Sequence, residues 1–347
     1  MRIGIAFDLI PIESGGDGPD DRFEEFDRLE TVEAIAEVLR GEGHDVALLG
    51  DGRELLRRVL DDPPDFVWNL AEGQGVGRSR EARVPAALEM LGIPYSGSDP
   101  LTLAVSLDKD VSRRLVRSRG VRIPKATLVT PGADPGATER AVGVVFSDAA
   151  DYPVIVKPAF EGSSKGIRGR CLAEGAAEAV AAAIRLAGEY EQPVLVEEFI
   201  DGDEVTVGLV GNGEQVEVVG VMRIVPKGSA ARFVYSLEVK RDWRRRVDYE
   251  APALLSAEVM RRLIEEARLA FDALGCRDLA RIDFRFRDDL PYFIEANPLP
   301  GLAPVTSDLV ILARGHGLDH ADLIRKVLRA ALDRVGLPVS GAAESAP

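Results

Sequence analysis

Acidic residues late in the chain carry the most specific chemical signal in the sequence. Residues 281–286 read RIDFRF and residues 292–297 read YFIEAN. If both segments are strands, alternate side chains share a face, so Asp283 lies on a polar face and Glu295 shares a face with Asn297. A hairpin loop over residues 288–290 would then place Asp283 directly opposite Glu295.

Two like charges that face each other across a strand pair destabilise the sheet unless a positive charge lies between them. A hard cation such as Mg²⁺ binds one or two carboxylates together with phosphate oxygens and water. Asp283 and Glu295 therefore predict a divalent-cation site. On the hairpin alone one alternative stays open, a solvated face whose charge Arg281 and Arg285 balance, because surface charge pairs are common and weak.

A second cluster combines a lysine with a loop of small residues. Residues 154–158 read VIVKP and residues 161–166 read EGSSKG. An apolar strand ending in Lys157, followed by backbone N–H groups and hydroxyls, is able to cover a polyphosphate. For this loop alone, an ordinary flexible turn is the alternative. There is no G-x-x-x-x-G-K-[ST] motif, and no G-x-G-x-x-G follows the first predicted strand, so P-loop and dinucleotide-binding folds lose their main support.

Carboxylates also gather around residues 194–204. The apolar run at 194–200, VLVEEFI, predicts a buried strand, and Glu197, Glu198 and Glu204 lie within it or shortly after it. Taken alone, these carboxylates are typical of solvated turn charges. The segment assigns no role by itself.

The first hundred residues are expected to form an α/β unit, which we assign to residues 1–105. Strands are predicted at residues 3–7, 45–49 and 66–70, and helices at 28–40 and 81–91. This alternation favours a parallel sheet. Ser106 is predicted to cap the next helix, which has Asp108 in its first turn and ends at Arg119.

Two further units complete the predicted organisation. The unit at 106–195 holds a strand at 154–157, the Gly-Ser loop, a helix at 176–187 and a strand at 194–200. The unit at 196–337 holds strands at 204–210, 216–224, 280–287 and 291–296, a charged loop at 226–246, and helices at 256–274 and 321–335. Residues 338–347 form a Ser- and Ala-rich tail that is expected to fray.

Composition excludes several classes of protein. The 347 residues are 46% hydrophobic and 29% charged, as in globular and not in disordered chains. The net charge of −15 opposes binding to nucleic acid or to anionic lipid. No apolar run could span a membrane and the first residues do not resemble a secretory signal, so we expect a cytoplasmic protein. Cys171 and Cys276 have no paired spacing and are expected to be small buried hydrophobes.

In their order, these motifs resemble the ATP-grasp superfamily and, more narrowly, the D-alanyl-D-alanine ligases. The resemblance spans most of residues 66–305. It is carried by LGIPYSGS at 91–98, LDK at 107–109, KP at 157–158, EGSSKG at 161–166, RID at 281–283 and EAN at 295–297. It implies an ATP-grasp fold, which is α/β overall and α+β in its C-terminal half. An N-terminal pre-ATP-grasp domain with a parallel sheet would precede it in the chain and would bind substrate.

The resemblance also implies which residues bind ATP. The phosphates would be bound by Lys109, Lys157, Ser163, Ser164 and Lys240, the adenine amine by Glu197 and the ribose hydroxyls by Glu204. Two Mg²⁺ ions, with Mn²⁺ as a substitute, would be held by Asp283, Glu295 and Asn297.

The implied reaction joins a carboxylate, such as that of an amino acid, to an amine. The carboxylate attacks ATP to give an acyl phosphate, and the amine then displaces phosphate, releasing ADP and phosphate. Arg281 and the backbone N–H of Gly301 would stabilise the tetrahedral oxyanion. The Ser163 loop and the 226–246 loop would form a lid that excludes water. The partners would be small molecules, and a homodimer is common among relatives.

Two alternatives to a ligase stay open. One is a regulatory or scaffold protein that binds ATP and has lost the chemistry. The other is an ATP-grasp kinase, which forms ADP without joining two substrates. Retention of Arg281, Asp283, Glu295 and Asn297 argues against mere ATP binding, because binding alone needs no oxyanion donor.

The chain departs from the family pattern where the family holds its substrates. The first strand ends in FDLI, without the family's Gly-Gly turn and Ser-x-Glu, and Glu24 or Glu25 is the candidate for the missing glutamate. Residues 69–81 lack the family's His-Gly and Gly-Glu-Asp-Gly patterns. Lys240 is followed by Arg241 where the ligases carry a substrate-side Tyr. The identities of the acid and the amine, D-alanine included, therefore stay open.

Overall fold

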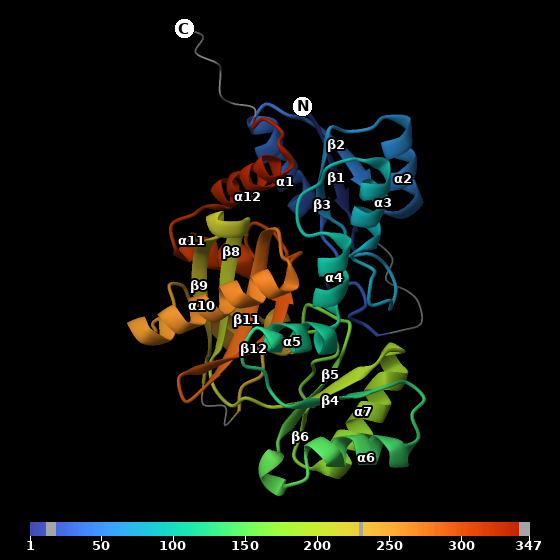
Figure 1. Ribbon diagram of the computed structural model, residues 1–347, viewed down its shortest axis with the longest axis vertical. Coiled ribbons are helices and arrows are strands. Elements are labelled where there is room, and N and C mark those ends of the chain that lie inside the picture. Colours follow the sequence, from blue (N-terminus) through green and yellow to red (C-terminus); the bar gives the residue numbers. More distant parts are fainter. Residues whose placement is uncertain (12–18, 229–231, 340–347) are drawn as a thin grey trace.

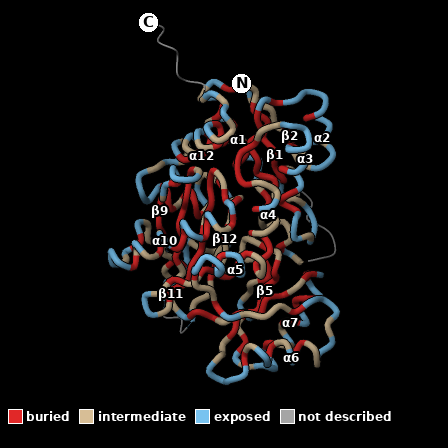
Figure 2. Tube along the Cα trace, viewed as in Figure 1, coloured by how far each residue is buried: buried red, intermediate tan, exposed pale blue. Residues whose placement is uncertain are grey.

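Three β-sheets organise the chain, and each gathers strands from one stretch of sequence. The computed structural model describes residues 1–11, 19–228 and 232–339. In Figure 1 the N-terminal sheet lies at the top, the four-stranded sheet of the middle segment at the bottom, and the five-stranded sheet beside them. Figure 2 shows that the strands of all three sheets are largely buried, while exposed residues concentrate on the outer helices and loops.

The N-terminal sheet is parallel, as the alternation of strands and helices predicts. Its order is β2-β1-β3, with β1 (Arg2–Phe7) between β2 (Asp45–Gly50) and β3 (Phe66–Leu70). Both β1 and β3 are almost wholly buried, as expected of apolar strands covered on two faces. The helices of this part are α1 (Leu29–Gly41), α2 (Gly52–Asp61), α3 (Arg83–Leu91) and α4 (Pro100–Leu107).

The middle sheet is antiparallel and has helices on one face only. Its order is β4-β7-β5-β6, formed by β4 (Ala126–Val129), β7 (Val194–Glu198), β5 (Val154–Pro158) and β6 (Leu172–Ala173). Val154 and Val156 pack in one core with α6 (Pro135–Val145) and α7 (Ala176–Tyr190). Side chains alternate along a strand, so Lys157 points to the opposite face, away from these helices.

The five-stranded sheet is antiparallel, in the order β10-β9-β8-β11-β12. Its strands are β8 (Glu204–Gly211), β9 (Glu217–Pro226), β10 (Val247–Glu250), β11 (Asp278–Arg287) and β12 (Leu290–Asn297). One face packs Ile282 and Phe284 against α10 (Ala257–Leu274). The other face is partly covered by α11 (Asp308–Gly315) and α12 (His320–Val335), whose core continues into the N-terminal sheet.

The polar residues of β11 therefore share the face opposite α10, as the sequence alternation predicts.

Short elements lie between the main ones: α8 (Leu237–Arg241), α9 (Trp243–Arg246), and the 3-10 turns η1 (Ala149–Asp151) and η2 (Gly213–Gln215). Cys171 and Cys276 are both buried and free, as expected. Within the ranges given above, no helix is long and apolar enough to cross a membrane.

The prediction that Ser106 caps the helix ending near Arg119 is wrong, because Ser106 belongs to the preceding helix, α4. Asp108, not Ser106, is the N-cap of α5 (Lys109–Ser118), and its Oδ1 accepts hydrogen bonds from the backbone N–H groups of Asp110 and Val111, each at 3.1 Å. Asp108 has an extended backbone, which separates α5 from α4. Ser106 instead lies buried in the last turn of α4.

The predicted domain boundaries stay a prediction. The N-terminal sheet lies within residues 1–105, whereas β7 crosses the proposed boundary at residue 195. Most of the predicted tail, residues 340–347, lies outside the described residues, and so do residues 229–231 of the charged loop.

Candidate active site

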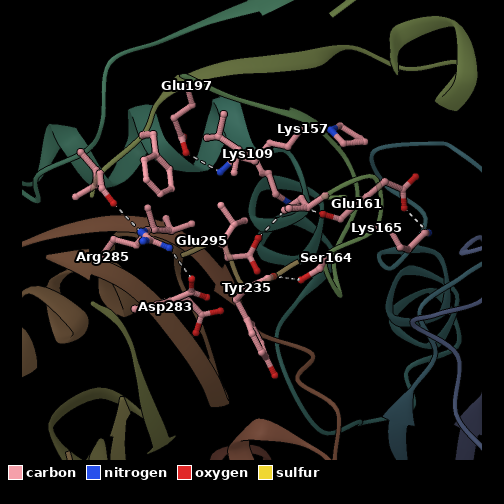
Figure 3. Close-up of a pocket in the computed structure, with 18 of the residues that line it drawn as sticks. Lys109, Lys157, Glu161, Ser164, Lys165, Glu197, Tyr235, Asp283, Arg285 and Glu295 are labelled. Carbon is pink, nitrogen blue, oxygen red and sulfur yellow. Dashed lines mark hydrogen bonds and ion pairs between the residues drawn. The ribbon is translucent and has the colours of Figure 1, made fainter. Parts of the chain in front are cut away.

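Two adjoining pockets lie where the middle and five-stranded sheets face each other. The first pocket is lined by β5 and β7 of the middle sheet and by β8, β11 and β12 of the other. The second pocket lies between β12 and its following loop, the 161–163 segment and the N-terminal unit. Lys109, Glu161 and Glu295 line both. Figure 3 shows Glu197 on one side of the first pocket and Asp283, Arg285 and Glu295 on the other.

The β11–β12 hairpin places Asp283 opposite Glu295, as expected, but not through the predicted loop. The loop has two residues, Asp288 and Asp289, with φ of 51° and 59°. Asp tolerates this left-handed conformation, which suits a tight hairpin. Phe284 pairs with Phe293 and Asp283 with Glu295, so one extra residue, Ile294, forms a bulge in β12. This bulge creates the carboxylate pair, because without it Ile294 would lie opposite Asp283.

Asp283 is surrounded by donors. Arg281 donates from Nε to Oδ1 at 2.9 Å and from Nη2 to Oδ2 at 2.8 Å. The Thr206 hydroxyl donates to Oδ1 at 2.5 Å, and the Asn297 amide donates to Oδ2 at 3.1 Å. Asp283 and Asn297 are therefore in direct contact.

Glu295 is balanced by a cation from another element. Lys109 Nζ lies 3.2 Å from Glu295 Oε2 and also donates to the backbone carbonyl of Glu161. Burial alone would raise the pKa of Glu295, but Lys109 and Arg281 outweigh it and lower the pKa to about 2. Glu295 is thus an anion at neutral pH, in the state that binds a cation.

The oxygen atoms at this hairpin fit a hard divalent cation. Two carboxylates and one amide oxygen, from Asp283, Glu295 and Asn297, are the ligand types that Mg²⁺ prefers beside phosphate oxygens. No cluster of three or more His, Cys, Asp or Glu side chains suited to a metal occurs in the described part of the chain. Two carboxylates and one amide would supply only part of the coordination shell of Mg²⁺.

The opposite wall of the first pocket pairs two residues for which the resemblance implies separate contacts with ATP. Lys157 Nζ donates to Glu197 Oε1 at 2.7 Å.

On the wall formed by the five-stranded sheet, Glu204 Oε2 lies 3.0 Å from Arg285 Nη1. Burial raises the pKa of Glu204 to about 7, Arg285 opposes the shift, and Asp283 and Glu295 add to it. The pocket therefore places lysine ammonium groups next to buried carboxyl groups.

The Gly-Ser loop closes over the pockets and touches the second predicted lid loop. Ser163 and Ser164 have φ of 49° and 60°, a conformation uncommon for residues other than glycine. Ser164 Oγ donates to the carbonyl of Tyr235 in the charged loop at 3.0 Å. The N–H of Gly162 donates to Glu25 Oε1 at 2.5 Å. The loop is thus held from both sides, by the C-terminal and the N-terminal units.

Eleven of the twelve residues singled out by the sequence line these pockets. The first pocket is lined by Lys109, Lys157, Ser164, Glu197, Glu204, Asp283 and Glu295, and the second by Lys109, Ser163, Arg281, Glu295, Asn297 and Gly301. Lys240 lies half-buried in α8 and is not among the described residues that line either pocket. At Gly301 a Cβ would lie 2.9 Å from Ser307 Oγ, so the chain passes close to that serine.

Sequence reasoning missed a buried charge cluster beside the second pocket. Arg80 Nη2 lies 2.8 Å from Glu25 Oε2 and 3.3 Å from Glu161 Oε2, and Lys165 contacts both glutamates. Glu72 and Glu81 line the same pocket. The one local signal was the i,i+4 spacing of Glu161 and Lys165, because the other partners come from distant segments.

Comparison with known proteins places these pockets in context. The family model described as D-ala D-ala ligase C-terminus matches residues 115–329. A D-alanine–D-alanine ligase of Gloeobacter violaceus is 32% identical over 336 residues, covering 93% of this chain and 99% of that protein. A crystal structure of the Bacillus anthracis D-alanine–D-alanine ligase complexed with ATP superposes with a TM-score of 0.71 at 22% identity, covering 96% and 98% of the two chains. The crystal structure of the VanG D-Ala:D-Ser ligase of Enterococcus faecalis superposes with a TM-score of 0.70 at 22% identity, covering 95% of this chain and 99% of that chain.

Proposed function

The chain belongs to the D-alanine–D-alanine ligase family, and from this premise we propose how its two pockets carry out ligation. It is an ATP-dependent carboxylate–amine ligase. The observation that carries the residue-level proposal is the sharing of Lys109 and Glu295 by both pockets. A phosphate-binding cation and a metal-binding carboxylate at this junction would let a phosphoryl group pass from a nucleotide in the first pocket to an acid in the second.

In the first pocket, we assign the lysines to the phosphates and the acids to the nucleoside. Glu197 already holds the Lys157 ammonium group in the pocket. Only a small movement of this ammonium group would therefore be needed for it to bind a phosphate. Glu197 would accept from the adenine amine and Glu204 from the ribose hydroxyls. Ser164, on the loop that reaches Tyr235, would help to close the lid over the phosphates. Lys240 would add a phosphate contact only after the charged loop moves.

At the β11–β12 hairpin, Asp283, Glu295 and Asn297 would hold Mg²⁺, with Mn²⁺ as a substitute. Bound there, the metal would neutralise phosphate charge during phosphoryl transfer. The residues themselves hold the oxygen ligands in place: Thr206 and Arg281 fix Asp283, and the bulge at Ile294 turns Glu295 toward it.

In the second pocket, we assign the substrate acid to the space near Arg281 and Gly301. The guanidinium of Arg281 and the N–H of Gly301 would stabilise negative oxygen as the amine adds to the activated acid. Ser163 lines the same pocket and would exclude water, which would otherwise hydrolyse an acyl phosphate. We propose that the acid belongs to an amino acid or an amino-acid derivative. The homodimer and the cytoplasmic location stay predictions.

The ligase is favoured over the two alternatives because the family's named members are ligases and the acids and Arg281 are retained. The test is to incubate the protein with ATP, Mg²⁺ and pairs of amino acids, D-alanine included, while phosphate release and product mass are measured. A ligase releases ADP and phosphate and forms an amide. A kinase gives ADP and a phosphorylated substrate without an amide, and a scaffold protein gives neither product.

A further inference from the structure

A further pocket, away from the two described above, is lined by four cations, and we call it the basic pocket. Arg113 and Arg117 belong to α5, and Arg122 and Lys125 belong to the loop between α5 and β4. None of the described residues that line it is acidic. Because the whole chain has a net charge of −15, the average surface does not explain this composition. The local excess of positive charge indicates a site for an anion.

The basic pocket lies between parts of the chain that belong to different sheets. Its walls are the second half of α5 with the loop that follows, the start of β4, Val145 at the end of α6, and Tyr292 of β12. Figure 1 shows α5 beside β12 and above β4. Among the described residues, none lines both this pocket and a pocket of the candidate active site. Its volume of about 600 Å³ is large enough for a small organic molecule.

Arg113 is the buried cation of the basic pocket. It is 7% exposed, and its Nη2 donates to the backbone carbonyl of Pro124. Its Nε is buried and has no hydrogen-bond partner among the described residues. The carboxylate of Asp110 is 3.9 Å from Nη1 of Arg113 but 3.0 Å from Nη2 of Arg114, so it mainly balances Arg114. A buried guanidinium with an unused donor is unfavourable, and an anion in the pocket would satisfy that donor.

Arg117 adds positive charge that no carboxylate balances. It lies four residues after Arg113, on the same face of α5, where two like charges repel each other. Arg117 is exposed, and its side chain forms no ion pair within the described part of the chain. Burial lowers the pKa of Arg113, nearby carboxylates oppose this shift, and Arg117 adds to it. An anion that contacts both guanidinium groups would offset their repulsion.

The other two cations lie on a loop whose backbone is fixed at both residues. The carbonyl of Arg122 accepts from a backbone N–H of β12 at 2.8 Å, and the carbonyl of Lys125 accepts from a backbone N–H at the end of β7, also at 2.8 Å. The side chains pair with carboxylates that do not line the pocket, those of Glu266 and Asp151. Arginine has five N–H donors and lysine has three, so donors remain for a ligand. A pocket that is already formed binds at a lower cost in ordering.

We propose that the basic pocket binds a small phosphorylated molecule, at a site separate from ligation. A phosphate ester carries almost two negative charges and three acceptor oxygens, which suits donors that converge from several elements. Arginine also pairs with phosphate through two parallel N–H···O bonds. An extended polyanion such as a nucleic acid is disfavoured, because it would also cover the acidic remainder of the surface. This proposal goes beyond the ligase and does not depend on it.

The test measures dissociation constants by calorimetry with the full chain. The nucleotide pocket is first filled with Mg²⁺ and a non-hydrolysable ATP analogue. The probes are fructose bisphosphate, uncharged fructose, and tricarballylate, which carries carboxylates in place of phosphates. We expect one fructose bisphosphate to bind per chain, about 10-fold or more tightly than either other probe. If it binds no more tightly than fructose or tricarballylate, the proposal is overturned.

Arg117→Gln tests where the probe binds. Arg117 is exposed and has no ion pair to lose, so the variant should fold normally, while the dissociation constant for fructose bisphosphate should rise about 10-fold. Arg119→Gln is the matched control, because it removes the same charge from an exposed position two residues away that does not line the pocket. It should change the dissociation constant by less than about threefold. Arg113→Gln should weaken binding at least as much as Arg117→Gln, and Arg117→Gln alone decides if that buried variant does not fold.

A variant in the nucleotide pocket separates this site from the ligase. Lys157→Met should leave the binding of fructose bisphosphate unchanged, because Lys157 does not line the basic pocket. Loss of binding in Lys157→Met but not in Arg117→Gln would place the probe in the nucleotide pocket and overturn the proposal. Equal losses in Arg117→Gln and Arg119→Gln would show attraction by overall charge and overturn it as well. Binding that depends on Arg117 in a protein without ligase activity would keep the basic pocket and reject the ligase.

Discussion

Lys157 on β5 and Glu197 on β7 form a buried ion pair, with 2.7 Å between Nζ and Oε1 and both side chains 3% exposed. The pair gives the first pocket a lysine whose charge is balanced before any nucleotide binds. A buried ion pair resists loss of one partner much more than replacement of both, because a single loss leaves an uncompensated charge.

We therefore predict a non-additive mutant cycle at this pair. Glu197→Leu should lower the free energy of unfolding by about 3–5 kcal/mol, because Lys157 stays buried without its partner. The double variant Lys157→Met with Glu197→Leu should lie within about 2 kcal/mol of the unmodified protein. Urea unfolding of the two single variants and the double variant measures the coupling. Additive losses would show that the pair contributes no coupling energy.

Glu295→Gln should reduce turnover on the order of 100-fold or more and leave the fold intact. The substitution removes a charged oxygen from the proposed metal site, and metal stabilisation of phosphoryl transfer amounts to several kcal/mol. Steady-state phosphate release over a range of Mg²⁺ concentrations measures the effect. Asp289→Asn, in the exposed turn of the same hairpin, is the control. Near-normal activity of Glu295→Gln would reject the metal assignment.

Ser164→Ala should loosen the contact between the two lid loops. The lost hydrogen bond to the Tyr235 carbonyl predicts a rise of about 2- to 10-fold in KM for ATP, with little change in thermal stability. Ser118→Ala removes an exposed hydroxyl contact on α5 and should leave KM unchanged. A KM for ATP that stays the same in both variants would show that this hydrogen bond plays no part in closure.

Two acids near the end of β1 predict how stability depends on pH. Burial raises the pKa of Asp27 from 3.8 to about 7, and repulsion from Asp8 adds to the shift. The folded protein therefore holds a proton that the unfolded chain releases above pH 3.8. This contribution to stability is present at low pH and is lost as pH rises through about 7.

Asp27→Asn should flatten this dependence. The stability gained by the variant over the unmodified protein should grow between pH 5 and pH 8, by on the order of 2 kcal/mol. Urea unfolding at both pH values provides the measurement. Asp61→Asn, at an exposed position of α2, should show no such difference. Equal gains at both pH values would assign the effect to something other than titration.

Local patterns in the sequence predicted the parallel N-terminal sheet, the β11–β12 hairpin and the opposition of Asp283 and Glu295. Each of these features depends on side-chain alternation within a strand or on the order of neighbouring elements. Both can be recognised in a short stretch of sequence. The hairpin prediction reached the correct pair with an incorrect loop. A two-residue turn and a bulge together shift the register as a three-residue loop would, and alternation cannot distinguish them.

The sequence alone determined which residue types were available: carboxylates and an amide on one hairpin, lysines beside a loop of small residues, and few groups suited to other chemistry. Only the tertiary structure decided their partners. Lys157 meets Glu197, Lys109 meets Glu295, and Glu25 is enclosed by Arg80 and Lys165. The physical reason is that the charge state and binding capacity of a buried group depend on the solvent it loses and the charges that surround it. In this protein those charges come from segments that are 40 to 186 residues away in the chain, such as Lys157 with Glu197 and Lys109 with Glu295.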